Sequence, residues 1–192
     1  MSSPLRAIIG LGNPGADYER TRHNAGFWFV EQLAAAQRES FRSEAKFQGE
    51  LARVRLGGED LLLFKPMTFM NRSGEPTQKL AQFYKLTPGD ILVAHDELDL
   101  PAGTVRLKLG GGHGGHNGLR SLHQHLGPEY RRLRIGIGHP GHKDLVHNYV
   151  LGRASRADEQ LIHDALIDAA AAVPVWLNQT WDKAVHQLHS GK

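Results

Sequence analysis

The sequence predicts an α/β fold in a single domain, and three observations support this prediction. Short apolar runs alternate along the chain with amphipathic stretches of helical period, as expected where strands and helices follow one another. The 192 residues are enough for one domain with a sizeable core, and no linker long enough to divide them occurs. Apolar residues make up 40% and charged residues 22%, which is typical of a soluble globular protein.

In the first half of the chain, a glycine turn marks the clearest strands. Gly57–Gly58 separates the runs Leu51–Leu56 and Asp60–Lys65, which are therefore expected to form a β-hairpin and to bring antiparallel pairing into the sheet. The other elements expected here are a buried strand over Ala7–Leu11 and helices over Asn24–Gln37 and Ser73–Lys85.

The second half begins with strands and ends in helices. Ile91–Ala94 is a continuous apolar strand, and two further strands alternate apolar with basic or glycine residues over Thr104–Leu109 and Arg132–Gly138. A short helix is expected over Leu119–Leu126. From about residue 155 the chain is helical: Ser155 and Asp158 form a possible capping box, a 3.6-residue period runs from Ile162 to Trp176, and Pro174 is expected to kink or split the helix.

Polar residues follow four of these strands. Asn13, Asn71, the pair His95–Asp96 and the pair His116–Asn117 each come after an apolar run. Ligands bind outside the carboxyl ends of parallel strands, so these loops share one edge of the sheet if most of the strands run parallel.

Composition limits the chemistry and the cellular location. The absence of cysteine excludes disulfides, cysteine-ligated zinc, iron–sulfur clusters and thiol nucleophiles, and a reducing cytoplasm is the simplest location. No apolar run approaches the roughly 20 residues that span a bilayer, and MSSPLRAIIG lacks the apolar core of a signal peptide. The formal net charge of +3 is compatible with a polyanionic partner but does not require one.

Two glycine-rich segments suggest a ligand. GLGNPG (Gly10–Gly15) matches the dinucleotide fingerprint, which leaves an NAD-dependent oxidoreductase as one alternative; Pro14 and the lack of a later acidic residue favour a tight turn that presents Asn13. LGGGHGGHNG (Leu109–Gly118) is typical of a loop whose backbone approaches a ligand, but it lacks the lysine and hydroxyl residue of a P-loop. His113 and His116, and His139 and His142, are each three residues apart, but no HExxH motif and no Cys/His set accompanies them, so no metal is expected.

Water is the natural nucleophile if the protein is a hydrolase, since Ser73 lies outside any nucleophile-elbow motif. A histidine has the pKa of a general base, and a neighbouring carboxylate would fix its tautomer. His23 and Asp96 could form that pair. The alternatives are an exposed residue before a helix for His23 and a turn or cap for Asp96.

Basic residues interrupt two of the predicted strands. Lys108 and Arg134 could clamp a phosphate, and the neighbouring Arg131 and Arg132 add to the positive charge. The same two residues fit equally well on the exposed face of an edge strand. A non-catalytic RNA-binding module therefore also remains open.

Five segments, in order and with matching spacing, closely resemble bacterial peptidyl-tRNA hydrolases. They are GLGNPG with TRHNAGFWFV (Gly10–Val30), KPMTFMNRSGE (Lys65–Glu75), HDELDLPAGTVRLKLGGGHGGHNGLRSL (His95–Leu122), YRRLRIGIGHPG (Tyr130–Gly141) and YVLG (Tyr149–Gly152). The resemblance implies one α/β domain over residues 1–192, with a twisted mixed sheet flanked by helices and a helical part from about 155. It also implies a cytoplasmic, usually monomeric enzyme with no metal or organic cofactor.

The resemblance further implies cleavage of the ester between a peptide, or an N-blocked amino acid, and the 3′ end of tRNA. His23 would activate water and Asp96 would keep it basic, while Asn13 would help to distinguish blocked from free aminoacyl-tRNA. Asn71 and Asn117 would contact the substrate near the peptide and the ester, and Asn117 would also help to place the water. Tyr18 and Phe69 would line the site of the 3′ end. Lys108 and Arg134 would clamp the tRNA 5′ phosphate.

Overall fold

One mixed sheet organises the computed structural model, in which residues 4–190 are described. Within that range the sheet has seven strands in the order β2-β3-β4-β1-β5-β7-β6. The strands are β1 (Ala7–Gly10), β2 (Arg42–Glu44), β3 (Gly49–Leu56), β4 (Glu59–Pro66), β5 (Ile91–Glu97), β6 (Val105–Leu109) and β7 (Arg131–Gly136). The helices are α1 (Ala25–Ala36), α2 (Gly74–Tyr84), α3 (Asn117–Leu126), α4 (Val146–Val150), α5 (Arg156–Asn178) and α6 (Trp181–Ser190).

The pairing of the strands confirms the predicted α/β class and the predicted hairpin. Four central strands run parallel, since β1 pairs with β4 and β5, and β5 pairs with β7. The outer strands are antiparallel: β3 pairs with β2 and β4, and β6 pairs with β7. Residues 1–3 and 191–192 of the expected domain lie outside the described residues.

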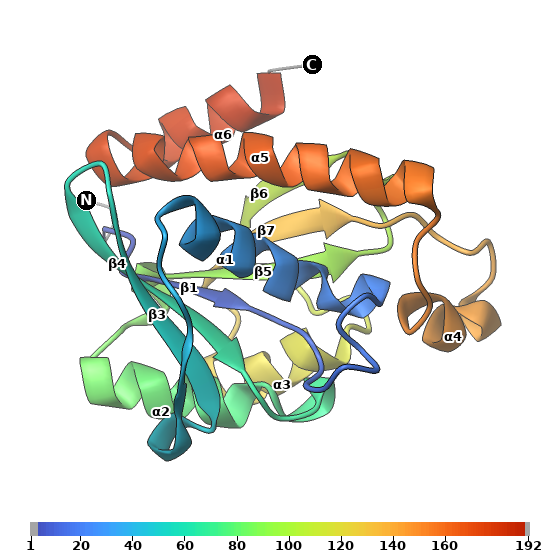
Figure 1. The fold of residues 1–192 in the computed structure, drawn as a ribbon, viewed down its shortest axis with the longest axis horizontal. Helices are drawn as coiled ribbons and strands as arrows, with labels where there is room; N and C mark the ends of the chain where they lie inside the picture. Colours follow the sequence, from blue (N-terminus) through green and yellow to red (C-terminus); the bar gives the residue numbers. More distant parts are fainter. Residues whose placement is uncertain (1–3, 191–192) are drawn as a thin grey trace.

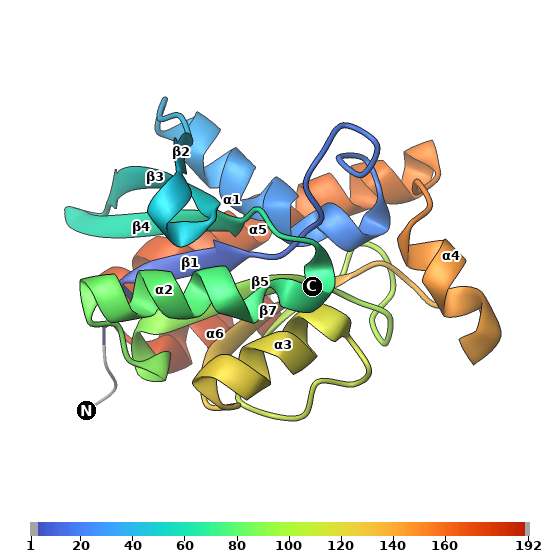
Figure 2. The ribbon, with the colours of Figure 1, turned by 90° about the horizontal axis from the view of Figure 1, so that it is seen from below.

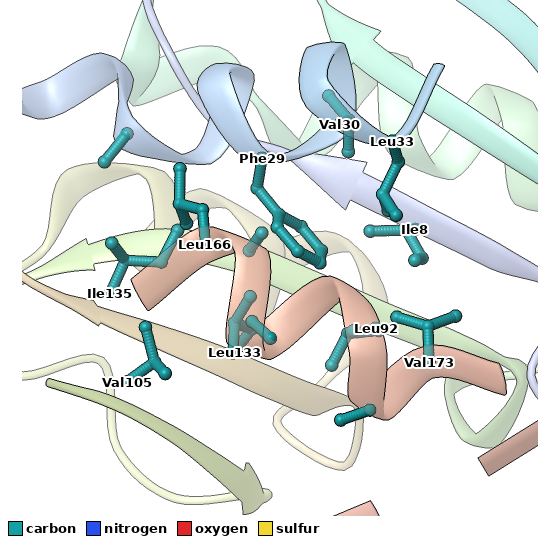
Figure 3. Packing of buried hydrophobic residues seen from close by; sticks show 14 of the residues in the cluster. Ile8, Phe29, Val30, Leu33, Leu92, Val105, Leu133, Ile135, Leu166 and Val173 are labelled. Atoms are coloured by element: carbon teal, nitrogen blue, oxygen red, sulfur yellow. The ribbon is translucent and has the colours of Figure 1, made fainter. Parts of the chain in front are cut away.

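Helices cover both faces of the sheet. α1, α5 and α6 lie on one face and α2 and α3 on the other (Figures 1 and 2). Because side chains alternate along a strand, Ile8 and Ile9 of β1 enter different cores, one on each face. Figure 3 shows the first core, where Phe29 of α1 and Leu166 of α5 pack above Leu133 of β7. Burial on both faces explains why β1 and the first residues of β5 are continuous apolar runs.

Helix α5 satisfies the length and hydropathy of a membrane span, but it packs against the sheet. The most apolar stretch of the helix has a mean hydropathy of 1.2. Its residues Ile162, Leu166 and Trp176 are buried in the first core. The Ser155 hydroxyl accepts a hydrogen bond from the Asp158 amide at 3.1 Å, which forms the serine half of the predicted capping box. The helix continues past Pro174 to Asn178, so the proline does not split it.

One expectation about the strands is wrong, and the condition that the strands run parallel does not hold for β6. β5 extends to Glu97, so His95 and Asp96 lie inside the strand rather than after it. β6 runs antiparallel to β7, with Leu109 opposite Arg131 at the amino end of the parallel strands. Asn117 therefore does not reach the shared edge by following a parallel strand. The glycine-rich run instead leads the chain back along the sheet to the start of α3.

Candidate active site

An open cleft of about 870 Å³ lies at the carboxyl ends of the central strands. It is lined by all nine residues that the sequence singled out: Asn13, Tyr18, His23, Phe69, Asn71, Asp96, Lys108, Asn117 and Arg134. The residues come from β5, β6, β7, the start of α3 and the segments after β1 and β4, which are far apart in sequence. The cleft therefore brings the predicted residues together.

Close packing of two glycines places the N-terminus of α1 over the cleft. A Cβ on Gly10 would lie 2.4 Å from the Gly26 carbonyl oxygen, and a Cβ on Gly26 would lie 2.3 Å from the Ala94 carbonyl oxygen. The glycines let the helix contact the ends of β1 and β5 directly. This packing accounts for Gly10 of the GLGNPG segment, whose loop presents Asn13 to the cleft.

The structure brings His23 and Asp96 into direct contact. His23 lies in the short 3₁₀ turn before α1, and its Nδ1 is 2.8 Å from Oδ2 of Asp96. Both residues are buried, with 9% and 3% of their surface exposed. A carboxylate can only accept, so Nδ1 carries the proton and Nε2 of His23 remains a free base. The alternatives of an exposed histidine and a turn aspartate are both wrong.

A second histidine, His116, completes the contacts of this carboxylate. Its Nδ1 accepts from the amides of Gly118 and Leu119 at 3.1 and 3.3 Å and caps α3. Because amides only donate, the proton of His116 is on Nε2, which donates to Oδ1 of Asp96 at 2.8 Å. Sequence reasoning assigned no role to His116. Its helix-capping position before Asn117 was the available signal.

The charge of Asp96 controls the protonation of its neighbours. Burial lowers the pKa of His23, but the negative charge and hydrogen bond of Asp96 outweigh burial and leave that pKa above its ordinary 6.5. Burial alone would raise the pKa of Asp96, yet the two histidines hold it well below its usual range. Burial and the neighbouring His116 lower the pKa of His95 to about 3, so His95 is neutral. Asp96 is thus ionised and accepts a hydrogen bond from each of His23 and His116.

The same three groups have the spacing of a possible metal site. One ligand atom each of His23, Asp96 and His116 lie within 4.8 Å of one another. The two histidine protons donated to Asp96 account for this spacing without an ion. A metal bound through the two ring nitrogens that face Asp96 would displace both of these protons.

Asn13 lines the cleft, and a hydrogen bond fixes the orientation of its carboxamide. Its side-chain oxygen accepts from the Met70 amide at 2.7 Å, which fixes the orientation of the carboxamide and leaves Nδ2 as a donor. Asn24 supports the turn from behind: its side chain accepts from the Asn13 amide at 2.8 Å and donates to the Asn13 carbonyl at 3.0 Å. Sequence reasoning missed Asn24. Its two contacts to one backbone residue are visible only in three dimensions.

The other polar and aromatic residues surround this centre. Asn71 lies in the 3₁₀ turn before α2, and Asn117 is the first residue of α3; both are exposed at the cleft. Tyr18 and Phe69 meet edge to face with ring centroids 5.9 Å apart, and Phe69 is 55% exposed. Phe69 thus presents an exposed ring on which a base can stack, and the half-buried Tyr18 lies against it.

Cations gather on one face of β6 and β7. Lys108 pairs with Arg132 across the two strands, and Arg106 pairs with Arg134, so all four extend to the same face. Lys108 is exposed on the edge strand β6, while Nε of Arg134 is 2.8 Å from Glu97. Both interpretations of Lys108 therefore describe the same surface: an exposed edge-strand face that also borders the cleft.

A mixed α/β sheet with a carboxylate–imidazole pair at the carboxyl ends of its parallel strands defines a class of protein equipped for general-base chemistry. Comparisons with known proteins then specify the family. The family model for peptidyl-tRNA hydrolase matches residues 7–192. The chain therefore belongs to the peptidyl-tRNA hydrolase family.

Individual relatives match this chain over nearly its whole length. The chain is 52% identical to the peptidyl-tRNA hydrolase of Neisseria gonorrhoeae over 99% of this chain and 100% of that protein. It is 50% identical to that of Photorhabdus laumondii over 99% and 98%. The crystal structure of the Acinetobacter baumannii enzyme superposes with a TM-score of 0.93 at 48% identity, over 96% and 94% of the two chains. The protein is thus a hydrolase, and its family implies peptidyl-tRNA as substrate.

Proposed function

We propose that the protein hydrolyses the ester bond between the peptide, or an N-blocked amino acid, and the 3′ end of tRNA, with a water molecule activated by His23. This reaction recycles tRNA from prematurely released peptidyl-tRNA. The observation that carries the proposal is the contact of Asp96 with Nδ1 of His23, which leaves Nε2 as a base in a cleft. A base of this kind contributes about 10²–10⁴-fold to a rate.

In the proposed reaction, His23 transfers one proton from the water to the leaving ribose oxygen. Nε2 takes a proton from water while the water oxygen forms a bond to the ester carbonyl carbon. The negative charge of Asp96 stabilises the imidazolium that results. When the tetrahedral intermediate collapses, the bond to the ribose oxygen breaks, and that oxygen takes the proton from Nε2. The products are the peptide carboxylic acid and the free hydroxyl of the tRNA.

Carboxamides suit the peptide side of this substrate, because an amide group both donates to and accepts from a peptide backbone. In the proposal, Asn71 and Asn117 hold the peptide backbone and the ester region, and Asn117 also helps to place the water. Nδ2 of Asn13, left free by the bond of its oxygen to Met70, donates to a substrate carbonyl. Asn13 thereby helps to distinguish blocked from free aminoacyl-tRNA.

The RNA side of the substrate extends toward β6 and β7 in the proposal. Tyr18 and Phe69 line the site of the tRNA 3′ end, where stacking is tolerant of sequence. Lys108 and Arg134 hold the 5′ phosphate at the end of the acceptor stem. Phosphate contacts carry no sequence information, which suits an enzyme that accepts many tRNAs. We further propose that the enzyme works in the cytoplasm as a monomer, without a metal or organic cofactor.

Single-turnover cleavage of an N-acetyl-aminoacyl-tRNA tests the proposal. The wild-type protein should release the amino acid from the blocked substrate and spare the unblocked one. His23→Ala should reduce the rate constant by about 10²–10⁴-fold while tRNA binding stays within a few-fold, since only the base is lost. Rates come from quenched reactions, and binding comes from filter retention of the tRNA.

His186→Ala is the matched control, because His186 is exposed on α6 and outside the cleft. Its rate should equal that of the wild type. Most turnover remaining in His23→Ala would disprove the role of His23. Binding of the tRNA without any cleavage by the wild type would favour an RNA-binding module instead.

A further inference from the structure

An arginine of the sheet holds the glycine-rich run Leu109–Gly118 by hydrogen bonds. Arg132 of β7 is only 3% exposed, and its guanidinium donates to two successive carbonyls of the run. Nη1 is 2.6 Å from the Gly112 oxygen, and Nη2 donates to the Gly111 oxygen. One planar fork therefore fixes two neighbouring peptide groups at once.

The guanidinium is committed to the protein itself. Its Nη2 also contacts Nε2 of His123 at 3.1 Å, and Tyr130 packs against it with its ring centre 5.2 Å from Cζ. A guanidinium only donates, so Nε2 of His123 accepts and the histidine is neutral. Burial and the charge of Arg132 both lower the pKa of His123, which favours that form. No carboxylate among the described residues forms an ion pair with Arg132.

The run needs such an anchor because its glycines leave the backbone free. Gly110, Gly111, Gly114 and Gly115 all have φ between 58° and 105°, a region in which glycine pays no steric penalty but loses much entropy on ordering. Between Gly112 and α3 the run is stabilised by a hydrogen bond within itself, in which the His116 amide donates to the His113 carbonyl at 2.9 Å. His116 then reaches Asp96.

We infer that Arg132 is a positioning residue for the hydrolysis proposed above: by holding the carbonyls of Gly111 and Gly112, it fixes the path of the glycine-rich run and so places His116 against Asp96 and Asn117 at the cleft. Arg132 acts through the run, not through the RNA. Lys108, on the same face, is exposed and keeps its amino group for a phosphate, whereas both terminal nitrogens of Arg132 are already bound.

The substitution Arg132→Lys separates the two roles. Lysine keeps the charge but has one compact ammonium in place of the planar fork, so it cannot hold both carbonyls in the same geometry. We expect kcat to fall at least tenfold, while the salt dependence of KM, which reports phosphate contacts, stays near the wild-type value. Amide hydrogen exchange at residues 111–117 should accelerate at least tenfold, measured by NMR on the free protein.

Arg131→Lys is the matched control. Arg131 is the preceding residue of β7 and faces the opposite side of the sheet, where it donates to the Gly89 carbonyl at 2.9 Å and packs over Trp176 and Trp181. The same change there should leave kcat and the exchange of the glycine-rich run unchanged. Equal acceleration in both variants would mean general loosening of β7 and would overturn the inference.

The exchange measurement also keeps this inference separate from the proposed function. Unchanged exchange at residues 111–117 in Arg132→Lys would overturn the positioning role whatever the activity. A wild-type protein that failed to cleave the ester would refute the proposed function and leave the exchange result interpretable.

The wild type provides a second readout should Arg132→Lys fail to fold. The Nη protons of Arg132 should exchange slowly and should not shift when an RNA acceptor-stem hairpin is added. Fast exchange of these protons, or a large shift on RNA binding, would show a guanidinium free for phosphate and would disprove the inference.

Discussion

At the scale of single residues, Asp96 determines how the site can work. Its two oxygens each accept one histidine proton, from Nδ1 of His23 and from Nε2 of His116. This arrangement fixes both tautomers and leaves Nε2 of His23 as the single basic nitrogen of the pair. A side chain with only one acceptor could not support both rings, so the carboxylate cannot be exchanged for its amide without loss.

Asp96→Asn should therefore reduce kcat and move its pH profile. The amide has one acceptor oxygen and one amino group, so one of the two imidazole protons would face a donor. Loss of the negative charge also removes the interaction that raises the pKa of His23. A base must be neutral, so the acidic limb of kcat/KM should shift to lower pH, while kcat falls by about 10²-fold or more.

Steady-state rates from pH 5 to 9 would measure both effects. Asp168→Asn, an exposed change on α5 outside the cleft, should keep the wild-type profile. An Asp96→Asn variant that lost binding but kept its kcat and its acidic limb would argue against the assigned role.

At the scale of elements, the site depends on how closely α1 approaches the sheet. The three atoms nearest to a Cβ on Gly26 are the Ala94 oxygen at 2.3 Å and the Leu11 nitrogen and oxygen at 2.5 and 2.7 Å. All belong to the backbone and cannot rotate away. Any side chain there would push the start of α1, and with it the turn that carries His23, out of the cleft.

Gly26→Ala should destabilise the protein although alanine is the better helix former. The helix preference favours alanine by at most about 1 kcal/mol, whereas overpacking against fixed backbone costs about 1–3 kcal/mol or more. The free energy of unfolding, from urea titration, should fall by the difference, and kcat should fall as His23 moves. Gly112→Ala, where an added Cβ meets nothing within 4 Å, should keep the wild-type stability; an unchanged stability in Gly26→Ala would contradict the packing argument.

The elements also show what the sequence could and could not predict. Continuous apolar runs and period-2 alternation located the central strands, and a period of 3.6 located the helices, because these patterns report which sides of each element are buried. They carry no strand direction, so the antiparallel course of β6 was not foreseen. The role of His116 was not predicted because its contact with Asp96 depends on the folded path of the glycine-rich run, which contacts such as those with Arg132 determine.

At the scale of the whole molecule, the placement of charge is more informative than its total. A net charge of +3 on 192 residues is small. The four cations of β6 and β7 nevertheless share one face beside the cleft, while the β3–β4 hairpin lies toward the opposite end of the sheet. Because salt screens exposed charges beyond about 8–10 Å, only cations near the bound RNA should contribute to its affinity.

Lys108→Ala tests this local action against a general effect of net charge. Each phosphate contact adds about 0.7–0.9 to the slope of log affinity against log salt concentration, so losing Lys108 should lower the slope by about that amount and leave kcat at saturation nearly unchanged. Arg55→Ala is the matched control, because it removes the same charge from an exposed pair with Asp60 on the distant hairpin. Its slope should equal that of the wild type. The slopes come from tRNA binding measured between about 50 and 300 mM salt. Equal slopes in both variants would mean that only the total charge matters and that Lys108 does not contact a phosphate.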